Sequence, residues 1–269
     1  MVSKDWLVKL NKEFHDIGIE HKYRPWKALD KYSKEFNIPV NLQSDIAKEI
    51  FEWFKIHTKF DSQKISVLYE TIYFYDSEFW LLTFPQIYGQ VKLDIFASLE
   101  MPNSLKQKLL EDKRELYIYT EYWKKSLDYG LKLKEMYRFD MDSSVIDLIS
   151  AASQDLRSAV SDLKGTQLNS SAVFSSRMAV EKFFKAYINL KQGLTKQRAK
   201  KINHDLSKCF EEFIKIAGFI NIENIEEKLS IFPRMDERYN KLEISREDLW
   251  DCFKVAQLVG TIVMKECAI

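Results

Sequence analysis

The sequence has one pronounced charge asymmetry, between residues 182 and 208. A single acid, Asp205, stands there against eight basic residues, which are Lys182, Lys185, Lys191, Lys196, Arg198, Lys200, Lys201 and Lys208. Clustered lysines and arginines gain affinity by neutralising phosphates and releasing counterions, so the stretch is a candidate contact for RNA or a nucleotide. The alternative is a solvated lysine-rich loop, because no aromatic residue stands between Lys191 and Lys208 to stack on a base. The sequence leaves both interpretations open.

Two pairs of residues near this stretch could do chemistry. Arg198 and His204 have five residues between them, and the histidine could serve as a general acid or base or only brace a helix start. Arg177 and Glu181 lie four apart on a predicted helix, a spacing that favours an intrahelical ion pair, although they could also face a ligand or a partner subunit. The other three histidines do not combine with carboxylates at metal-ligand spacing, so we expect no metal site and no cofactor.

Composition limits the fold that positions these residues. The chain has 269 residues, enough for two domains, and 46% of them are hydrophobic. It holds only 7 Gly and 5 Pro, and apolar residues recur at helical spacing, so we expect an all-α protein. Three separated cysteines and charges within the first residues predict reduced thiols, no secretory signal and a cytoplasmic location.

The N-terminal part, residues 1–140, is expected to be a mostly helical domain of unknown role. Helical patterns cover residues 7–17, 25–36 and 44–57, and a long helix should start at a capping box of Ser104 and Gln107. The aromatic stretch from Tyr69 to Tyr88 cannot be assigned to helix or strand by periodicity. It could line a pocket for a flat ligand, although an aromatic core is the commoner outcome.

The C-terminal part, residues 141–269, should fold by itself as a bundle of capped helices. The first is expected to begin at Ser144, the second to span residues 171–190, and the third to begin at Asn203 or His204. A short helical piece should follow at residues 222–232. The last helix should start at Ser245, with Asp248 as its capping partner.

The segment Ser175-Ser-Arg-Met-Ala-Val-Glu-Lys-Phe-Phe-Lys-Ala-Tyr, followed by Asn203-His-Asp-Leu, resembles the second and third helices of HEPN domains. Arg238-Tyr239 and the final helix fit the later part of the same pattern. The resemblance covers about residues 144–269. It implies a four- or five-helix up-and-down bundle that usually forms a homodimer. Apolar residues off the main stripes support a second buried face, which a partner subunit would cover: Val180, Phe184, Tyr187, Trp250, Leu258 and Ile262.

The resemblance implies a non-catalytic module that binds RNA, a nucleotide or a protein partner such as a nucleotidyltransferase, in a stress, toxin–antitoxin or phage-defence setting. The residues expected to contact a ligand are Arg177, Glu181, Lys182, Lys185, Lys196, Lys200, Lys201, Asp205, Arg238 and Tyr239.

Two alternatives remain. HEPN ribonucleases carry an Arg and a His with four to six residues between them, usually at the start of the last helix. No His occurs between Arg234 and Asp251, so a metal-independent endoribonuclease would have to use Arg198 and His204 in an unusual place. The second alternative is a purely structural or interaction protein.

Overall fold

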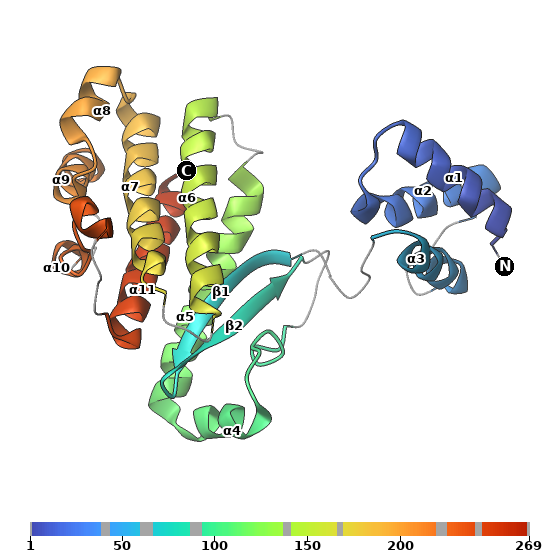
Figure 1. Cartoon of the computed structure of the whole chain (residues 1–269), viewed down its shortest axis with the longest axis horizontal. Coiled ribbons are helices and arrows are strands. Elements are labelled where there is room, and N and C mark those ends of the chain that lie inside the picture. The colour runs from blue at the N-terminus through green and yellow to red at the C-terminus, as the bar shows by residue number, and fades with distance from the viewer. Residues whose placement is uncertain are drawn as a thin grey trace. The chain divides into compact units, whose positions relative to one another are not determined.

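The computed structural model of the chain describes residues 2–38, 44–59, 67–86, 93–136, 141–165, 169–218, 225–239 and 244–267. The chain divides into two compact units, Met1–Ser66 and Val67–Ile269 (Figure 1). This division differs from the one expected at residues 140 and 141. The reason is that side chains between Tyr69 and Met136 share one hydrophobic core with those of the C-terminal bundle.

The first unit contains the expected helices, α1 (Lys4–Asp16), α2 (Arg24–Phe36) and α3 (Asp45–His57), with a short 3-10 turn, η1 (His21–Tyr23), before α2. The Ser3 hydroxyl caps α1 and the Ser44 hydroxyl caps α3, each accepting a backbone N–H three residues later. Their apolar stripes meet in a separate core that includes Leu10, Ile50 and Phe54.

The second unit opens with a β-hairpin, which accounts for the aromatic stretch as far as Pro85. Tyr88, at the end of that stretch, lies outside the described residues. Strands β1 (Val67–Tyr75) and β2 (Glu78–Pro85) pair antiparallel, with Tyr75 opposite Glu78. The two turn residues, Asp76 and Ser77, both have positive φ, as the tight turns of two-residue hairpins require. Several of its aromatic side chains are buried, so they form core rather than an open pocket.

The long helix expected from Ser104 is two helices, α4 (Asn103–Glu111) and α5 (Lys113–Glu135). The break lies at Asp112, whose extended backbone leaves the helix while its carboxylate accepts the N–H groups of Arg114 and Glu115. The expected capping box at Ser104 is wrong, because α4 starts after Pro102 without a side-chain cap.

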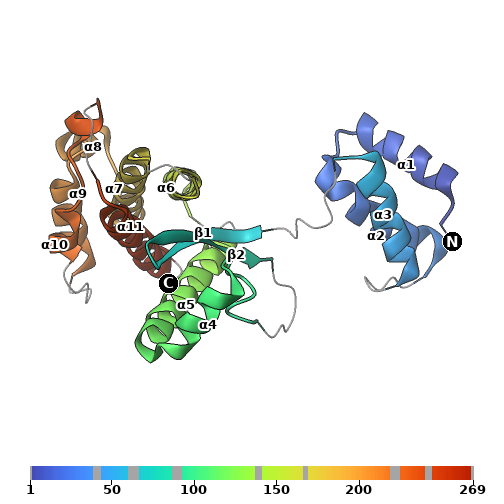
Figure 2. The same ribbon diagram turned by 60° about the horizontal axis from the view of Figure 1, so that its bottom comes forward.

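The bundle consists of α6 (Ser143–Leu163), α7 (Ser171–Gln192), α8 (Lys196–Ile202), α9 (Leu206–Ala217), α10 (Ile225–Leu229), a 3-10 turn η3 (Met235–Tyr239) and α11 (Arg246–Cys267). Helix α7 contacts α6, α9 and α11, while α5 packs against α11 and β1. Figure 2 shows the hairpin lying beside α5, and β1 also contacts α6.

The N-terminal caps of α11, α6 and α9 agree only in part with those expected from the sequence. Helix α11 has the expected capping box, since the Ser245 hydroxyl accepts the Asp248 N–H and the Asp248 carboxylate accepts the Ser245 N–H. Helix α6 is capped by Asp142 rather than by Ser144. Helix α9 begins at Leu206 with Asp205 as its cap, and residues expected to be a loop form α8, so the expected start at Asn203 or His204 is wrong.

The second apolar face of α7 is covered within the same chain. Val180, Phe184 and Tyr187 are buried, and the rings of Phe184 and Tyr187 pack on Phe213 of α9. On α7, the apolar surface that suggested a partner subunit is therefore largely covered by α9 of the same chain.

The expected all-α fold class is confirmed, with the small hairpin as an addition. Within the ranges that the structure describes, none of the helices combines the length and the apolar character needed to cross a bilayer.

Candidate functional site

A cluster of charged side chains lies around Glu181 on α7. This carboxylate is only 2% exposed, and its Oε1 atom accepts a hydrogen bond of 2.6 Å from Nζ of Lys185 and lies 2.9 Å from Nδ1 of His204. Its Oε2 atom lies 3.6 Å from Nη1 of Arg177. The ion pair expected between Arg177 and Glu181 is present, because residues four apart share one helical face.

Arg177 also holds the backbone next to α9. Its Nη2 donates a hydrogen bond of 2.5 Å to the carbonyl oxygen of His204. The preceding residue, Asn203, has φ of 49°, which turns the chain between α8 and α9 so that His204 faces α7. The histidine thus braces α7 against the start of α9, but the side chain that caps α9 is Asp205.

Hydrogen bonds among the described residues do not satisfy every charged or polar atom of this cluster. Burial lowers the pKa of the Arg177 guanidinium, although the nearby Glu181 carboxylate acts in the opposite direction. Nη1 of Arg177, Oε2 of Glu181 and the hydroxyl of Ser176 are buried without a hydrogen-bond partner among the described residues. The His204 side chain, in contrast, is 57% exposed, so one face of the cluster is open to solvent.

Several basic residues of the stretch 182–208 are neutralised inside the bundle. Lys182 pairs with Asp155 of α6 at 2.5 Å. Arg198 donates to Glu212 of α9 at 2.9 Å and also to Gln192. Lys185 pairs with Glu181, and Lys208 pairs with Asp205, the residue that caps its own helix. All four cations are engaged with carboxylates. The pair of Lys182 and Asp155 joins α7 to α6, and the pair of Arg198 and Glu212 joins α8 to α9, whereas the other two pairs lie within one helix and its cap.

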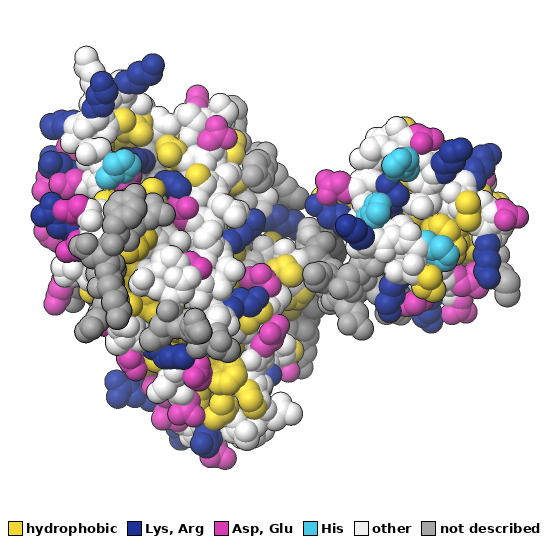
Figure 3. All heavy atoms as spheres, viewed as in Figure 1, with side chains coloured by type: hydrophobic (Ala, Val, Ile, Leu, Met, Phe, Trp, Pro, Cys, Tyr) yellow, Lys and Arg dark blue, Asp and Glu magenta, His cyan; other side chains and the backbone are white. Residues whose placement is uncertain are grey.

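Three lysines of α8 are different. Lys196, Lys200 and Lys201 are exposed, and none of them contacts a carboxylate in the described part of the chain. Lys196 and Lys200 are four apart and share one helical face. Figure 3 shows Lys and Arg side chains gathered over α8 at one end of the bundle. We call Lys196, Lys200 and Lys201 the α8 lysine patch.

The structure does not join Arg198 and His204 as one unit. Arg198 binds a carboxylate on α9, whereas His204 binds one on α7. Arg238 and Tyr239 fall in η3, but their side chains lie outside the described residues. Among the described residues, no group of three His, Cys, Asp or Glu side chains is arranged to hold a metal ion.

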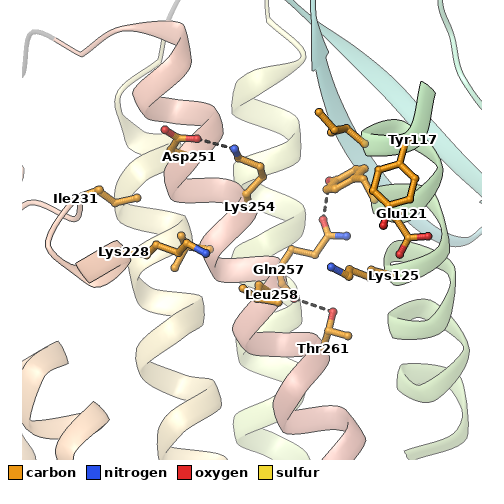
Figure 4. Close-up of a pocket in the computed structure, with 13 residues that line it drawn as sticks. Tyr117, Glu121, Lys125, Lys228, Ile231, Asp251, Lys254, Gln257, Leu258 and Thr261 are labelled. Carbon is orange, nitrogen blue, oxygen red and sulfur yellow. Dashed lines mark hydrogen bonds and ion pairs between the residues drawn. The ribbon is translucent and has the colours of Figure 1, made fainter. Parts of the chain in front are cut away.

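A groove between α5 and α11 was not foreseen from the sequence. It has a volume of about 520 Å³ and opens between Tyr117, Ile118 and Lys125 on α5 and Lys254 and Leu258 on α11, with α10 at one side (Figure 4). Its walls come from segments more than a hundred residues apart, so no local spacing could reveal it. The only sequence signal is the pair of apolar residues at positions 117 and 118, in a helix whose core stripe already passes through Tyr119 and Trp123.

Part of the chain is similar to a known protein family. Residues 145–267 match the model of the HEPN domain. The matched range contains α7, the Glu181 cluster and the α8 lysine patch, and it leaves out the hairpin, α4 and α5. Searches of curated proteins and of solved structures found no match to the chain.

Proposed function

Because residues 145–267 form a HEPN domain, we propose that the chain is a non-catalytic HEPN module that binds RNA through the α8 lysine patch. The observation that carries the proposal is that Lys196, Lys200 and Lys201 are exposed without a carboxylate partner among the described residues. Four other cations of the same stretch are paired with carboxylates, namely Lys182, Lys185, Arg198 and Lys208. Lys191, at the end of α7, is exposed like the lysines of the patch. The lysines of this patch therefore offer unpaired charge to an incoming phosphate backbone.

Contacts between lysines and phosphates determine how RNA binding at this patch should depend on salt and on the RNA sequence. Each lysine that neutralises a phosphate releases counterions, so affinity falls steeply with added salt. Lysine is a point charge on a flexible stem, which favours backbone contacts over reading of base edges. The expected binding is thus weak to moderate and tolerant of sequence. The resemblance to HEPN proteins is also what suggests a toxin–antitoxin or phage-defence setting and a nucleotidyltransferase-type partner.

The experiment compares two triple variants with the unmodified protein. The patch variant carries the substitutions Lys196→Gln, Lys200→Gln and Lys201→Gln. The control variant loses the same charge at three exposed positions elsewhere, through Lys108→Gln, Lys113→Gln and Lys164→Gln. Binding to a labelled single-stranded RNA is measured by fluorescence anisotropy at several salt concentrations. The patch variant should bind at least tenfold more weakly, and its salt slope should fall by about 2 units, at roughly 0.7 per lost phosphate contact. Equal losses in both triple variants would reject the patch as the binding site.

A second candidate function rests on the contact between His204 and Glu181. A carboxylate on Nδ1 fixes the orientation of an imidazole and leaves Nε2 to exchange protons, an arrangement that general acid–base catalysts use. This observation favours an endoribonuclease.

The two functions differ in their response to His204→Ala. For a binding module, the variant should keep nearly full RNA affinity, and the unmodified protein should leave the RNA intact. For a ribonuclease, the RNA is cut, and His204→Ala lowers the rate by about 10²–10⁴-fold with affinity unchanged. Cleavage that disappears in His204→Ala and persists in the patch variant would replace the first function by the second.

A further inference from the structure

We propose that the groove between α5 and α11 binds a small organic anion with an apolar body, of the size of a medium-chain or aromatic carboxylate. The volume of about 520 Å³ falls within the range of ligand pockets, roughly 300–1,000 Å³. The site is separate from the α8 lysine patch and does not depend on RNA binding. One wall belongs to α5, which precedes the HEPN domain, so the site exists only where that helix pairs with α11.

The apolar part of the ligand has a defined surface to contact. Tyr117 is 68% exposed and its neighbour Ile118 is 43% exposed, both on the α5 wall. Leu258 and Val255 line the opposite wall on α11, and Ile231 lies at the edge next to α10. Large exposed apolar side chains that face one another across a concavity favour an apolar occupant.

The charges around the groove favour an anion. Lys125, Lys228 and Lys254 line it together with two acids, Glu121 and Asp251. Both acids are engaged: Asp251 pairs with Lys254 at 2.7 Å, and Glu121 pairs with Lys124, outside the groove, at 3.0 Å. Lys125 has no carboxylate partner in the described part of the chain.

Figure 4 shows the Lys125 amine directed toward α11 across the groove. An anionic head held by this amine would leave the rest of the ligand along Ile118 and Leu258.

The floor of the groove is rigid and neutral. Gln257 is 3% exposed, and its Oε1 atom accepts hydrogen bonds from the hydroxyls of Thr71 at 2.7 Å and Tyr122 at 2.8 Å. Its amide donates to the hydroxyl of Ser126. Burial raises the pKa of Tyr122, so this hydroxyl remains neutral and does not repel an anion. A floor fixed before binding lowers the entropic cost of capturing a ligand.

The test uses two fluorescent probes on the full chain, 8-anilinonaphthalene-1-sulfonate and its uncharged analogue N-phenyl-1-naphthylamine. The sulfonate should bind saturably at one site, and decanoate should displace it while inorganic phosphate should not. Lys125→Gln should weaken binding of the sulfonate by about fivefold to tenfold and leave the uncharged probe unaffected, because a hydrogen bond to a charged group is lost. Leu258→Asp should weaken both probes.

Lys113→Gln is the matched control, since Lys113 lies on the same helix as Lys125, is exposed, does not line the groove and pairs with no acid among the described residues. It should leave both probes unchanged. Because the sulfonate also binds partly unfolded proteins, each variant must keep a cooperative thermal transition and its near-ultraviolet circular dichroism. The proposal is overturned if binding is unsaturable, if Leu258→Asp has no effect, if Lys113→Gln and Lys125→Gln act equally, or if phosphate displaces the probe.

Discussion

Nδ1 of His204 lies 2.9 Å from Oε1 of Glu181, so an exposed imidazole ring rests on an almost fully buried carboxylate. The contact joins the turn before α9 to the middle of α7. Glu181 faces three basic side chains, from Arg177, Lys185 and His204, and only the last of these is open to solvent. The carboxylate is therefore the centre of the cluster, and the histidine is its outer edge.

This arrangement predicts unequal effects of two substitutions on stability. Glu181→Gln leaves the buried Arg177 without a counter-charge, so the free energy of unfolding should fall by about 3–5 kcal/mol. His204→Ala removes only an exposed contact and should cost less than about 1 kcal/mol. Urea denaturation followed by circular dichroism measures both. A larger loss for His204→Ala would mean that the histidine, and not the carboxylate, holds the cluster together.

The shared core predicts which fragment of the second unit folds. A fragment of residues 67–269 keeps the hairpin and α5 against the bundle and should unfold cooperatively. A fragment of residues 142–269 exposes the faces of Phe183 and Gly260 that Tyr129 of α5 covers, and it should lose that transition. Differential scanning calorimetry distinguishes the two. A sharp transition in the shorter fragment would support the division expected from the sequence.

Helices α7 and α11 approach each other so closely at Gly260 that replacing this glycine by alanine should lower the stability of the protein instead of raising it. Replacing glycine by alanine within a helix usually stabilises by about 0.5–1 kcal/mol. A Cβ at Gly260 would lie 2.8 Å from the ring of Phe183, so Gly260→Ala should instead destabilise by about 1–3 kcal/mol. Thr261→Ala, one residue later and partly exposed, serves as the control and should be near neutral. A stabilising Gly260→Ala would show that the ring moves aside without cost.

The buried thiols predict a loss of stability at alkaline pH. Burial raises the pKa of Cys209 and of Cys252 to about 12, above the ordinary value of 9.0. Between these values the unfolded chain loses the thiol protons and the folded chain keeps them. The free energy of unfolding should therefore decrease as pH rises from about 9 to 12, by up to about 1.4 kcal/mol per pH unit for each thiol.

Cys209→Ala tests this assignment, because the variant should show a shallower decline over the same pH range. Urea denaturation at several pH values gives the slope, and an unchanged slope in the variant would assign the decline to other groups.

Local spacing in the sequence predicted most of the helices. The features that it did not predict depend on contacts between residues far apart in the chain. The stripes of α6 and α7, the box at Ser245 and the ion pair of Arg177 and Glu181 all depend on spacings within a few turns. Periodicity alone left the aromatic stretch open between helix and strand, although Asp76 and Ser77 between two aromatic runs were a usable hairpin signal. The second face of α7 could not be assigned, because apolar residues look the same whether α9 or another subunit covers them.

The homodimer remains a prediction with less support than the sequence suggested. Val180, Phe184 and Tyr187 are covered by the chain itself, whereas Leu258 and Ile262 on α11 are only partly buried. Light scattering at micromolar concentration decides it: a mass near the 31.9 kDa of one chain excludes the dimer.

The hydrogen bond between Thr71 of β1 and Gln257 of α11 spans 186 residues of sequence. At a synthesis rate of about 5–20 residues per second, Gln257 of α11 is therefore added about 10 to 40 s after Thr71 of the hairpin. Until α11 is made, the surface of Tyr73 and Phe74 that Trp250 covers stays open to other chains. The second unit should consequently depend on chaperones during translation more than its helical content alone would suggest.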